Sequence, residues 1–344
     1  MSRIPVSIVT GFLGSGKTTV LAHLLRHAAM GDAAVIINEF GEIGLDHHLV
    51  AASRDDVMVM SSGCLCCTIR TDLVDTLRSL HAKRECGEVS AFRRVLVETT
   101  GLADPAPILH TLMNDPLVMR QFVLDGVITT VDSLHGLRQL DEHMESLKQA
   151  AVADRLLLTK VDIAPADEVA RLRERLLRLN PGARLFEVVQ GDVDPEVLFD
   201  AGLYDPSTKS SVVTEWLRAE AFEDAGEQHC PDAHHHHHDV NRHDARIHAH
   251  CLVFDKALDW RYFSPNLASF VSRHAEKLLR VKAILNVQGE PQPVVVHGVQ
   301  HQFQRMRLAE WPDDDRRSKL VLITRDLGRD VIETWLRDDR LAEL

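Results

Sequence analysis

A phosphate-binding loop near the start of the chain is the feature that most restricts its fold. Residues 11–18 read G-F-L-G-S-G-K-T and match the pattern G-x-x-x-x-G-K-[ST]. The loop follows a β-rich run at Val6–Thr10 and precedes a helical pattern at Thr18–Ala29. Because loop N–H groups and a helix N-terminus together bind phosphate, this strand–loop–helix order predicts an α/β nucleotide-binding domain.

The residue types in the loop predict a site for a nucleoside triphosphate with Mg²⁺. Glycines let the backbone N–H groups converge on phosphate oxygens. We expect Lys17 to reach the β- and γ-phosphates and Thr18 to ligate Mg²⁺. The predicted nucleotide-binding residues of this segment are Gly11, Gly14, Ser15, Gly16, Lys17, Thr18 and Thr19.

Residues 1–205 alternate β-rich runs with helical patterns, which predicts a mostly parallel sheet covered by helices. The runs are Val6–Thr10, Ala34–Ile37, Val57–Met60, Arg94–Val97, Gly126–Val131, Arg155–Leu158 and Leu185–Val188. Helical patterns between them include Thr18–Ala29, Arg70–Lys83, Pro105–Met113 and Ala166–Leu179.

The composition changes after residue 205. Residues 206–246 contain proline, glycine and many histidines with little apolar periodicity, which predicts a His-rich linker or loop. Residues 247–344 predict a small α+β domain with helices at Trp260–Leu278 and from Arg329. Its expected strands are Ile247–Phe254, Leu279–Val287, Pro293–Gly298, Gln302–Met306 and Lys319–Thr324.

A second motif, Thr159-Lys160-Val161-Asp162, predicts that the base is guanine. The Asp162 carboxylate can accept hydrogen bonds from guanine N1–H and the 2-amino group, and adenine lacks both donors. The stem of Lys160 is expected to pack along the base. GTPases place asparagine at the first position of this motif; Thr159 keeps a hydroxyl there but has a shorter reach.

Two further segments are expected to respond to the γ-phosphate. Glu98 ends a buried run beside the loop, where a carboxylate can hold the Mg²⁺ water shell. Gly101 is expected to donate its N–H to the γ-phosphate, and Asn38–Glu42 is the other expected switch. The predicted catalytic residues are therefore Lys17, Thr18, Glu98 and Gly101. The sequence assigns no base to activate the attacking water.

Three clustered cysteines predict a soft-metal site. Cys64, Cys66 and Cys67 form a C-x-C-C motif between a β-rich run and a helical pattern. Thiolates suit Zn²⁺ or Cu⁺, and Zn²⁺ takes four tetrahedral ligands. A nearby carboxylate, best Glu42, or a histidine is expected to complete the shell. Such an incomplete shell suits metal transfer; the alternative is a group of buried structural cysteines.

A histidine run is the second metal-binding candidate. It consists of His234, His235, His236, His237 and His238, and further histidines and cysteines flank it, including His248, His250 and Cys251. Neutral imidazoles suit Zn²⁺, Ni²⁺, Co²⁺ and Cu²⁺. The alternative is an engineered tag, but the run is internal and scattered histidines continue it.

The bulk composition excludes several classes of function. A formal net charge of −12 argues against nonspecific nucleic-acid binding, which needs a basic surface. No apolar run reaches the roughly 18 residues of a membrane span. Six cysteines, three of them clustered, do not form a disulfide framework, so reduced thiols in the cytoplasm are expected.

Together these motifs resemble the CobW-like family of metallochaperone GTPases. The resemblance covers nearly the whole chain and rests on TGFLGSGKTT, NEFGE, GCLCC, ETTGLADP, LDGVITTVD, ADRLLLTKVD and LLRVKAILNVQGEPQPVVVHGVQ. It implies a GTPase domain at 1–205 and a CobW C-terminal domain at 247–344. It also implies metal at Cys64, Cys66 and Cys67, with Zn²⁺ first and cobalt as an alternative. Some relatives carry glutamate immediately before the NEFG segment, where this chain has Ile37.

Three functions were weighed against these motifs. The leading hypothesis is a GTP-hydrolysing metallochaperone whose metal affinity depends on nucleotide state and which delivers metal to a client metalloprotein. The second is a metal buffer with incidental GTP turnover. The third is a P-loop kinase, which would need a basic lid that the sequence lacks. Whether the chain forms a homo-oligomer is left open by the sequence.

Overall fold

The structure is a computed structural model that describes residues 3–39, 57–61, 68–199, 247–312 and 314–337. Two compact units divide the chain. The first comprises Met1–Gln139, Glu145–Arg173 and Arg184–Tyr204, and the second comprises Leu140–Met144, Glu174–Ala183 and Asp205–Leu344. The domain limit predicted at residue 205 lies inside the segment 200–246, which is outside the described residues, and the limit at residue 247 borders that segment, so both stay predictions.

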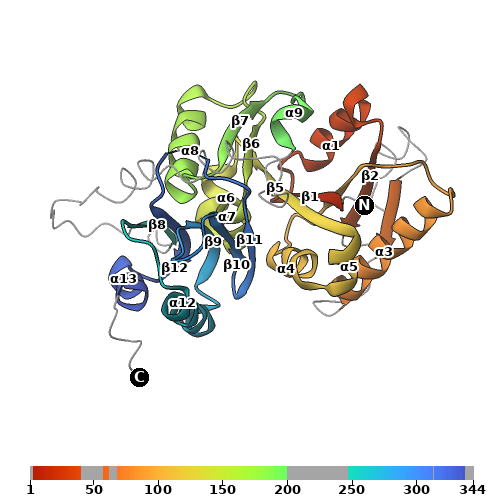
Figure 1. Cartoon of the computed structure of the whole chain (residues 1–344). Helices are drawn as coiled ribbons and strands as arrows, with labels where there is room; N and C mark the ends of the chain where they lie inside the picture. Colours follow the sequence, from red (N-terminus) through yellow and green to blue (C-terminus); the bar gives the residue numbers. More distant parts are fainter. Residues whose placement is uncertain (1–2, 40–56, 62–67, 200–246, 313, 338–344) are drawn as a thin grey trace. The chain divides into compact units, whose positions relative to one another are not determined.

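In the described part of the first unit, seven strands form one sheet in the order β3-β2-β4-β1-β5-β6-β7 (Figure 1). Each strand pairs with its neighbours in parallel. The strands are β1 (Ile4–Gly11), β2 (Ala33–Glu39), β3 (Val57–Ser61), β4 (Arg94–Glu98), β5 (Phe122–Asp132), β6 (Arg155–Thr159) and β7 (Arg184–Val188). All seven predicted runs are strands, which confirms the predicted α/β class.

Helices connect these strands. They are α1 (Lys17–Arg26), a 3₁₀ turn η1 (Ala28–Met30), α3 (Thr68–Glu85), α4 (Ala106–Asn114), α5 (Pro116–Gln121), α6 (Gly136–Glu142), α7 (Met144–Val152), α8 (Ala166–Leu179) and α9 (Pro195–Leu198). The four helical patterns named from the sequence correspond to α1, α3, α4 and α8. Helices α5, α6, α7 and α9 were not among the helical patterns named from the sequence.

The core of the first unit explains why α1 lies against the sheet. Leu21, Leu24 and Leu25 recur at helical spacing and are almost fully buried. They belong to one apolar cluster with Val9 of β1 and Val35 of β2. A central strand buried on both faces, as β1 is, fixes the start of the phosphate loop at the carboxyl edge of the sheet.

In the described part of the second unit, a five-stranded antiparallel sheet has the order β11-β10-β9-β12-β8. Helices α12 and α13 lie on one side of it (Figure 1). The elements are β8 (Ile247–Phe254), α12 (Trp260–His274), β9 (Leu278–Leu285), β10 (Val294–Val299), β11 (Gln302–Arg307), β12 (Ser318–Arg325) and α13 (Arg329–Arg337). This confirms the predicted small α+β domain.

One predicted boundary in this unit was wrong. The helix expected at Trp260–Leu278 ends at His274, and Leu278 instead begins β9. Every residue of β9 is buried. The apolar residue at the end of the predicted helix, Leu278, therefore belongs to the buried sheet and not to the helix. The exposed Lys277 lies in the turn, where its N–H bonds the carbonyl of His274.

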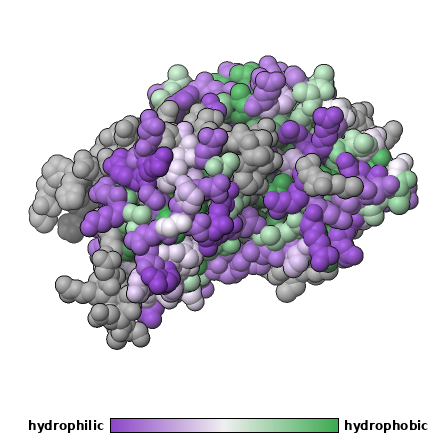
Figure 2. Space-filling model, in the orientation of Figure 1, coloured by the Kyte–Doolittle hydropathy of each residue, from purple (hydrophilic) through white to green (hydrophobic). Residues whose placement is uncertain are grey.

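The visible surface agrees with the composition. The face shown in Figure 2 is mainly hydrophilic, and hydrophobic residues on it form small separate areas. Within the described residues, no helix combines the length and apolar character needed to cross a membrane.

The buried His250 on β8 predicts a pH dependence of stability. Burial lowers the pKa of His250 from 6.5 to about 4, and its Nε2 lies 3.2 Å from the Leu327 carbonyl oxygen. The unfolded chain therefore binds this proton more readily between pH 6.5 and 4. The stabilisation by neutral His250 is complete above pH 6.5 and is lost as the pH falls toward 4. We expect a loss of about 2–3 kcal/mol in unfolding free energy.

Urea unfolding of the wild type and of His250→Gln across this pH range tests the prediction. Glutamine keeps a donor for the Leu327 carbonyl but does not titrate, so the variant should lose less stability on acidification. Parallel pH profiles for the two proteins would contradict the assignment.

Candidate nucleotide-binding site

The phosphate loop joins β1 to α1 in a conformation that requires glycine. Gly11, Gly14 and Gly16 have φ values of 142°, 71° and 90°. A Cβ on Gly11 would lie 2.3 Å from Thr130 Oγ1 and 2.4 Å from the Thr130 carbonyl oxygen. Ser15 Oγ is 2.6 Å from Thr130 Oγ1, so a hydrogen bond fixes the loop to β5. These constraints form the curved backbone that a phosphate needs.

The amino end of α1 suits an anion. Its N-cap, Gly16, provides no side-chain hydrogen bond, and its first turn contains no acidic residue. By contrast, Asp115 caps α5 and Asp259 caps α12 with their carboxylates. Because the first N–H groups of a helix have no intrahelical partner, the uncapped end of α1 can donate them to phosphate oxygens.

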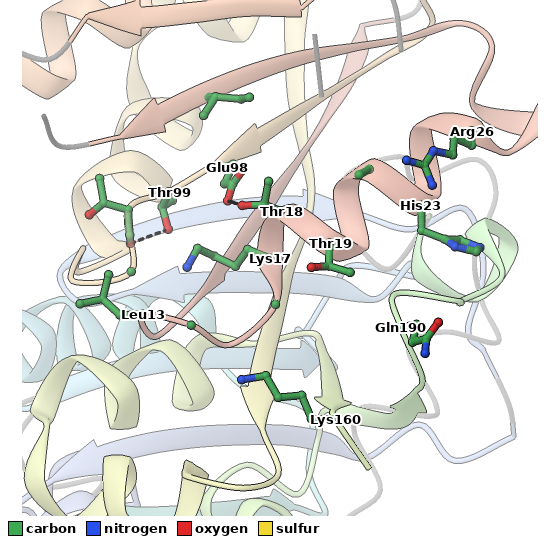
Figure 3. Close-up of a pocket in the computed structure, with 16 residues that line it drawn as sticks. Leu13, Lys17, Thr18, Thr19, His23, Arg26, Glu98, Thr99, Lys160 and Gln190 are labelled. Carbon is green, nitrogen blue, oxygen red and sulfur yellow. Dashed lines mark hydrogen bonds between the residues drawn. The ribbon is translucent and has the colours of Figure 1, made fainter. Parts of the chain in front are cut away.

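Lys17 lies at this helix start with its amine turned onto the loop. Its Nζ donates to the carbonyl oxygens of Gly11 at 2.9 Å and Phe12 at 3.2 Å. The side chain is buried, and Figure 3 shows it in the centre of the pocket. These weak neutral acceptors can be exchanged for phosphate oxygens, which makes stronger charge-assisted bonds with an ammonium group.

Thr18 and Glu98 form the oxygen pair expected for Mg²⁺. Thr18 Oγ1 donates to Glu98 Oε1 at 3.1 Å, and the carboxylate at the end of β4 is buried (Figure 3). A hydroxyl and a carboxylate beside a phosphate-binding helix are hard oxygen donors, which Mg²⁺ prefers. The residues present therefore fit this ion, with Thr18 as ligand and Glu98 toward its water shell.

The segment after β4 packs directly on the phosphate loop. A Cβ on Gly101 would lie 2.6 Å from the Leu13 nitrogen, so only glycine allows this approach. Thr99 is anchored to β1, because its Oγ1 donates to Thr10 Oγ1 at 2.8 Å. The Gln149 side-chain amide of α7 donates to the Gly101 carbonyl at 3.2 Å and to the Ala103 carbonyl at 3.0 Å. Gln149 was not anticipated from the sequence, since it comes from a helix that the patterns did not show.

Thr159, at the end of β6, bonds the backbone of the phosphate loop. Its Oγ1 donates to the Ser15 carbonyl at 2.8 Å and is 3.2 Å from the Val131 carbonyl. The hydroxyl thus ties β6 to the phosphate loop. The amide expected from the usual asparagine is replaced here by a shorter group that still reaches the loop backbone.

Lys160 follows in a left-handed conformation with φ of 59° and lines the pocket. Its Nζ lies 2.6 Å from Asp132 Oδ2, and the Asp132 side chain is 1% exposed. The Oδ1 atom of Asp132 accepts the Leu134 N–H at 2.8 Å, so the carboxylate is fixed at both oxygens. Sequence reasoning missed Asp132; its place at the end of β5, next to β6, was the available signal.

The turn after β7 lies against α1. Gln190 and Gly191 have φ values of 51° and 84°, and a Cβ on Gly191 would lie 2.7 Å from the Thr19 carbonyl. His23 Nε2 is 3.2 Å from Asp192 Oδ1, which joins the helix to this turn. Gln190 and His23 both line the pocket, where Figure 3 shows them near each other.

These elements enclose a cavity of about 470 Å³. Among the described residues that line it, Glu98 is the one acidic side chain, whereas Lys17, Arg26 and Lys160 are basic. A cationic cavity in a chain of net charge −12 selects an anionic ligand. Asp162 is exposed in the turn after β6 and is not among the lining residues, so its contact with guanine stays a prediction.

The predicted metal ligands lie almost entirely outside the described residues. This applies to Glu42, Cys64, Cys66, Cys67, His234, His235, His236, His237 and His238. Of the flanking candidates, His250 bonds the Leu327 carbonyl and Cys251 is buried. The described residues contain no group of three or more His, Cys, Asp or Glu side chains arranged to hold a metal ion.

Comparison with known proteins identifies the family. The model described as "CobW/HypB/UreG, nucleotide-binding domain" matches residues 5–187, and "Cobalamin synthesis protein cobW C-terminal domain" matches residues 247–338. The chain belongs to the CobW family. The predicted P-loop GTPase class is confirmed by this membership, and the kinase alternative is set aside.

Individual relatives extend over the whole chain. The zinc chaperone YjiA of Escherichia coli is 32% identical over 96% of this chain and 97% of its own length. The zinc chaperone CobW of Pseudomonas aeruginosa is 30% identical over 98% of this chain and 92% of its own. The crystal structure of Zn(II)-bound YjiA GTPase covers 98% of this chain and all of that chain, with a TM-score of 0.71 and 28% identity.

The position of Lys17 leads to a first prediction for this site. The substitution Lys17→Ala should lower kcat for GTP hydrolysis by a factor of about 100 or more, because the ammonium group stabilises charge on the transferred phosphoryl group. Phosphate release at saturating GTP is the measurement. Lys83→Ala, a lysine on α3 that does not line the cavity, serves as control and should retain turnover. Unchanged turnover in Lys17→Ala would mean that the loop does not bind the reacting phosphate.

The Lys160–Asp132 pair leads to a second prediction. Asp132→Asn removes the charge opposite Lys160 and should weaken GTP binding by about 1 kcal/mol, because the ion pair that holds Lys160 in place becomes a weaker bond from the ammonium group to an amide oxygen. In a Lys160→Met background the same substitution should leave GTP affinity unchanged. Calorimetric titration of all four proteins completes the double-mutant cycle. An equal loss in both backgrounds would show that Asp132 acts on the fold and not through Lys160.

Proposed function

We propose that this CobW-family GTPase is a zinc metallochaperone that binds the metal at Cys64, Cys66 and Cys67 and delivers it to a client metalloprotein. Metal affinity would depend on whether GTP or GDP is bound. Two of its relatives are named zinc chaperones, and a related GTPase has been crystallised with Zn(II). The cytoplasm, where thiols are reduced and GTP is abundant, is the compartment that suits this role.

The observation that best supports coupling is the alignment of strand ends at one edge of the sheet. In the parallel register, Ile37 of β2 lies beside Glu98 of β4, and Glu39 lies beside Ser61 of β3. The metal motif begins three residues after Ser61. Glu98, the carboxylate expected beside Mg²⁺, ends β4, which lies two strands from β3 in the sheet. Because carboxyl ends of adjacent parallel strands meet at one edge, β3, the strand that precedes the metal motif, ends at the same edge of the sheet as the nucleotide-binding residues.

The chain's own groups can sense the γ-phosphate. Lys17 would exchange the carbonyls of Gly11 and Phe12 for phosphate oxygens, and Thr18 would turn from Glu98 toward the ion. Bound Mg²⁺ supplies charge neutralisation at the β- and γ-phosphates. Gly101, whose carbonyl accepts a hydrogen bond from Gln149, would donate its N–H to the γ-phosphate. Each of these groups changes partner when the nucleotide changes.

Delivery requires that zinc affinity differ between the GTP-bound and GDP-bound states. The same coupling free energy then acts on both zinc binding and GTP binding. If GTP orders the segments after β2, β3 and β4, it pre-assembles the thiolates and raises zinc affinity. Thermodynamic linkage then requires zinc to raise GTP affinity by the same factor. Hydrolysis would weaken the metal site and favour transfer to the client.

We expect zinc to bind more tightly with a non-hydrolysable GTP analogue than with GDP, by about 1–3 kcal/mol. The difference should shrink at lower pH, because thiolate ligation releases protons and protonated cysteines compete with the metal. Competition titration with a Zn²⁺ indicator at two pH values measures both effects. Cys66→Ser is the matched control and should remove the nucleotide dependence. Equal affinities in both nucleotide states would favour a metal buffer over a chaperone.

A further inference from the structure

The second unit contains a groove that the nucleotide and metal chemistry does not use. It has a volume of about 410 Å³ and lies between one side of α12 and strands β10 and β11. Its apolar lining includes Trp260, Leu267 and Val271 from the helix and Val296 and Phe303 from the strands. All of its lining residues belong to this unit.

The charge of the groove is opposite to that of the chain. Arg305 and His301 line it, and no aspartate or glutamate is among its described lining residues. The whole chain has a net charge of −12, so the groove differs from the chain's average charge, as the nucleotide cavity does. Its chemistry is complementary to carboxylates flanked by apolar side chains.

Arg305 is held in position but keeps its charge available. Its guanidinium lies 4.3 Å from the centre of the Trp260 ring, an arrangement in which cation and aromatic face attract each other. The side chain is exposed, and within the described residues Arg305 forms no ion pair. By comparison, Arg307 pairs with Glu290 and Arg317 pairs with Asp315 in the same unit.

Within the described residues of this unit, an edge strand borders the groove. Strand β11 is at the edge of the sheet and pairs with β10 on one side. An edge strand presents backbone N–H and C=O groups to which an extended peptide can add. Phe303 and Arg305 alternate along β11 and both line the groove, so a peptide paired with β11 would place alternate side chains against them.

We propose that this groove binds an extended acidic segment of a partner protein, with apolar side chains against Trp260 and Phe303 and a carboxylate on Arg305. The proposal concerns a docking surface and does not depend on the metal site. A partner held here would be kept beside the GTPase through more than one nucleotide state, because no residue of the groove belongs to the nucleotide-binding residues.

Selection of short random peptides displayed on phage against the intact chain tests the chemistry without assuming a sequence. Enriched peptides should alternate apolar residues with aspartate or glutamate. Fluorescence anisotropy should show that Arg305→Glu weakens the best peptide by about tenfold or more. Arg273→Glu is the matched control, because Arg273 lies on Trp335 of the same unit, 5.3 Å from the ring centre, and is outside the groove. It should bind the peptide as the wild type does.

Backbone pairing is tested with the same peptide methylated at alternate nitrogens. Methylation on the strand-pairing side should abolish binding, and methylation on the other side should not. The proposal is overturned if enriched peptides lack carboxylates, if Arg305→Glu binds them like the wild type, or if both methylated forms bind equally. A self-association that Arg305→Glu abolishes, measured by sedimentation, would instead make a second copy of the chain the occupant.

Discussion

The close contact between the phosphate loop and β5 is the constraint on which the nucleotide site depends. At Gly11 there is no room for a Cβ beside the Thr130 backbone, and Ser15 bonds the Thr130 hydroxyl. Thr159 of β6 then holds the Ser15 carbonyl from the next strand. The loop is therefore shaped by two strands that follow it in the chain by more than a hundred residues. A pre-formed loop can donate its N–H groups to phosphate without first paying the entropy of ordering them.

Charge is distributed so that the site works in an acidic protein. Glu98, the one carboxylate among the described residues that line the cavity, bonds Thr18, and Asp132 pairs with Lys160 and is not among the lining residues. Glu98 is thus placed to orient the cation site, and Asp132 is placed to orient Lys160, so that neither carboxylate repels the phosphate. The same separation recurs in the second unit, where Arg305 is stacked on Trp260 away from the unit's carboxylates. Two cationic recesses on an anionic chain can attract acidic ligands over distances near the Debye length.

The parts of the site that follow from local sequence could be named from it, and those that depend on distant pairing could not. Lys17, Thr18 and Glu98 could be named because a motif or a strand end marks each of them. Asp132 and Gln149 contact the site through β5 and α7; a strand end marks Asp132, but neither neighbourhood shows which side chain or loop it will meet. The end of α12 was misjudged for the same reason, since the sheet and not local propensity decides that Leu278 belongs to β9. The metal ligands lie outside the described residues, so for them the sequence remains the only argument.

The contacts of the segment that contains Gly101, the residue expected to bind the γ-phosphate, bear on how a change of nucleotide could be transmitted. The segment after β4 is bound on one side to the phosphate loop by the Gly101–Leu13 contact. On its other side, Gln149 holds two of its carbonyls and Lys148 pairs with Asp104 at 2.6 Å. A shift of Gly101 must therefore either break the bonds to α7 or carry α7 with it. Breaking two neutral hydrogen bonds and a half-buried ion pair would cost about as much as a typical allosteric coupling energy supplies. If α7 moves together with Gly101, these bonds stay intact and that cost is avoided. The bonds between α7 and this segment therefore favour a change of nucleotide that moves α7 over one that is confined to the loop.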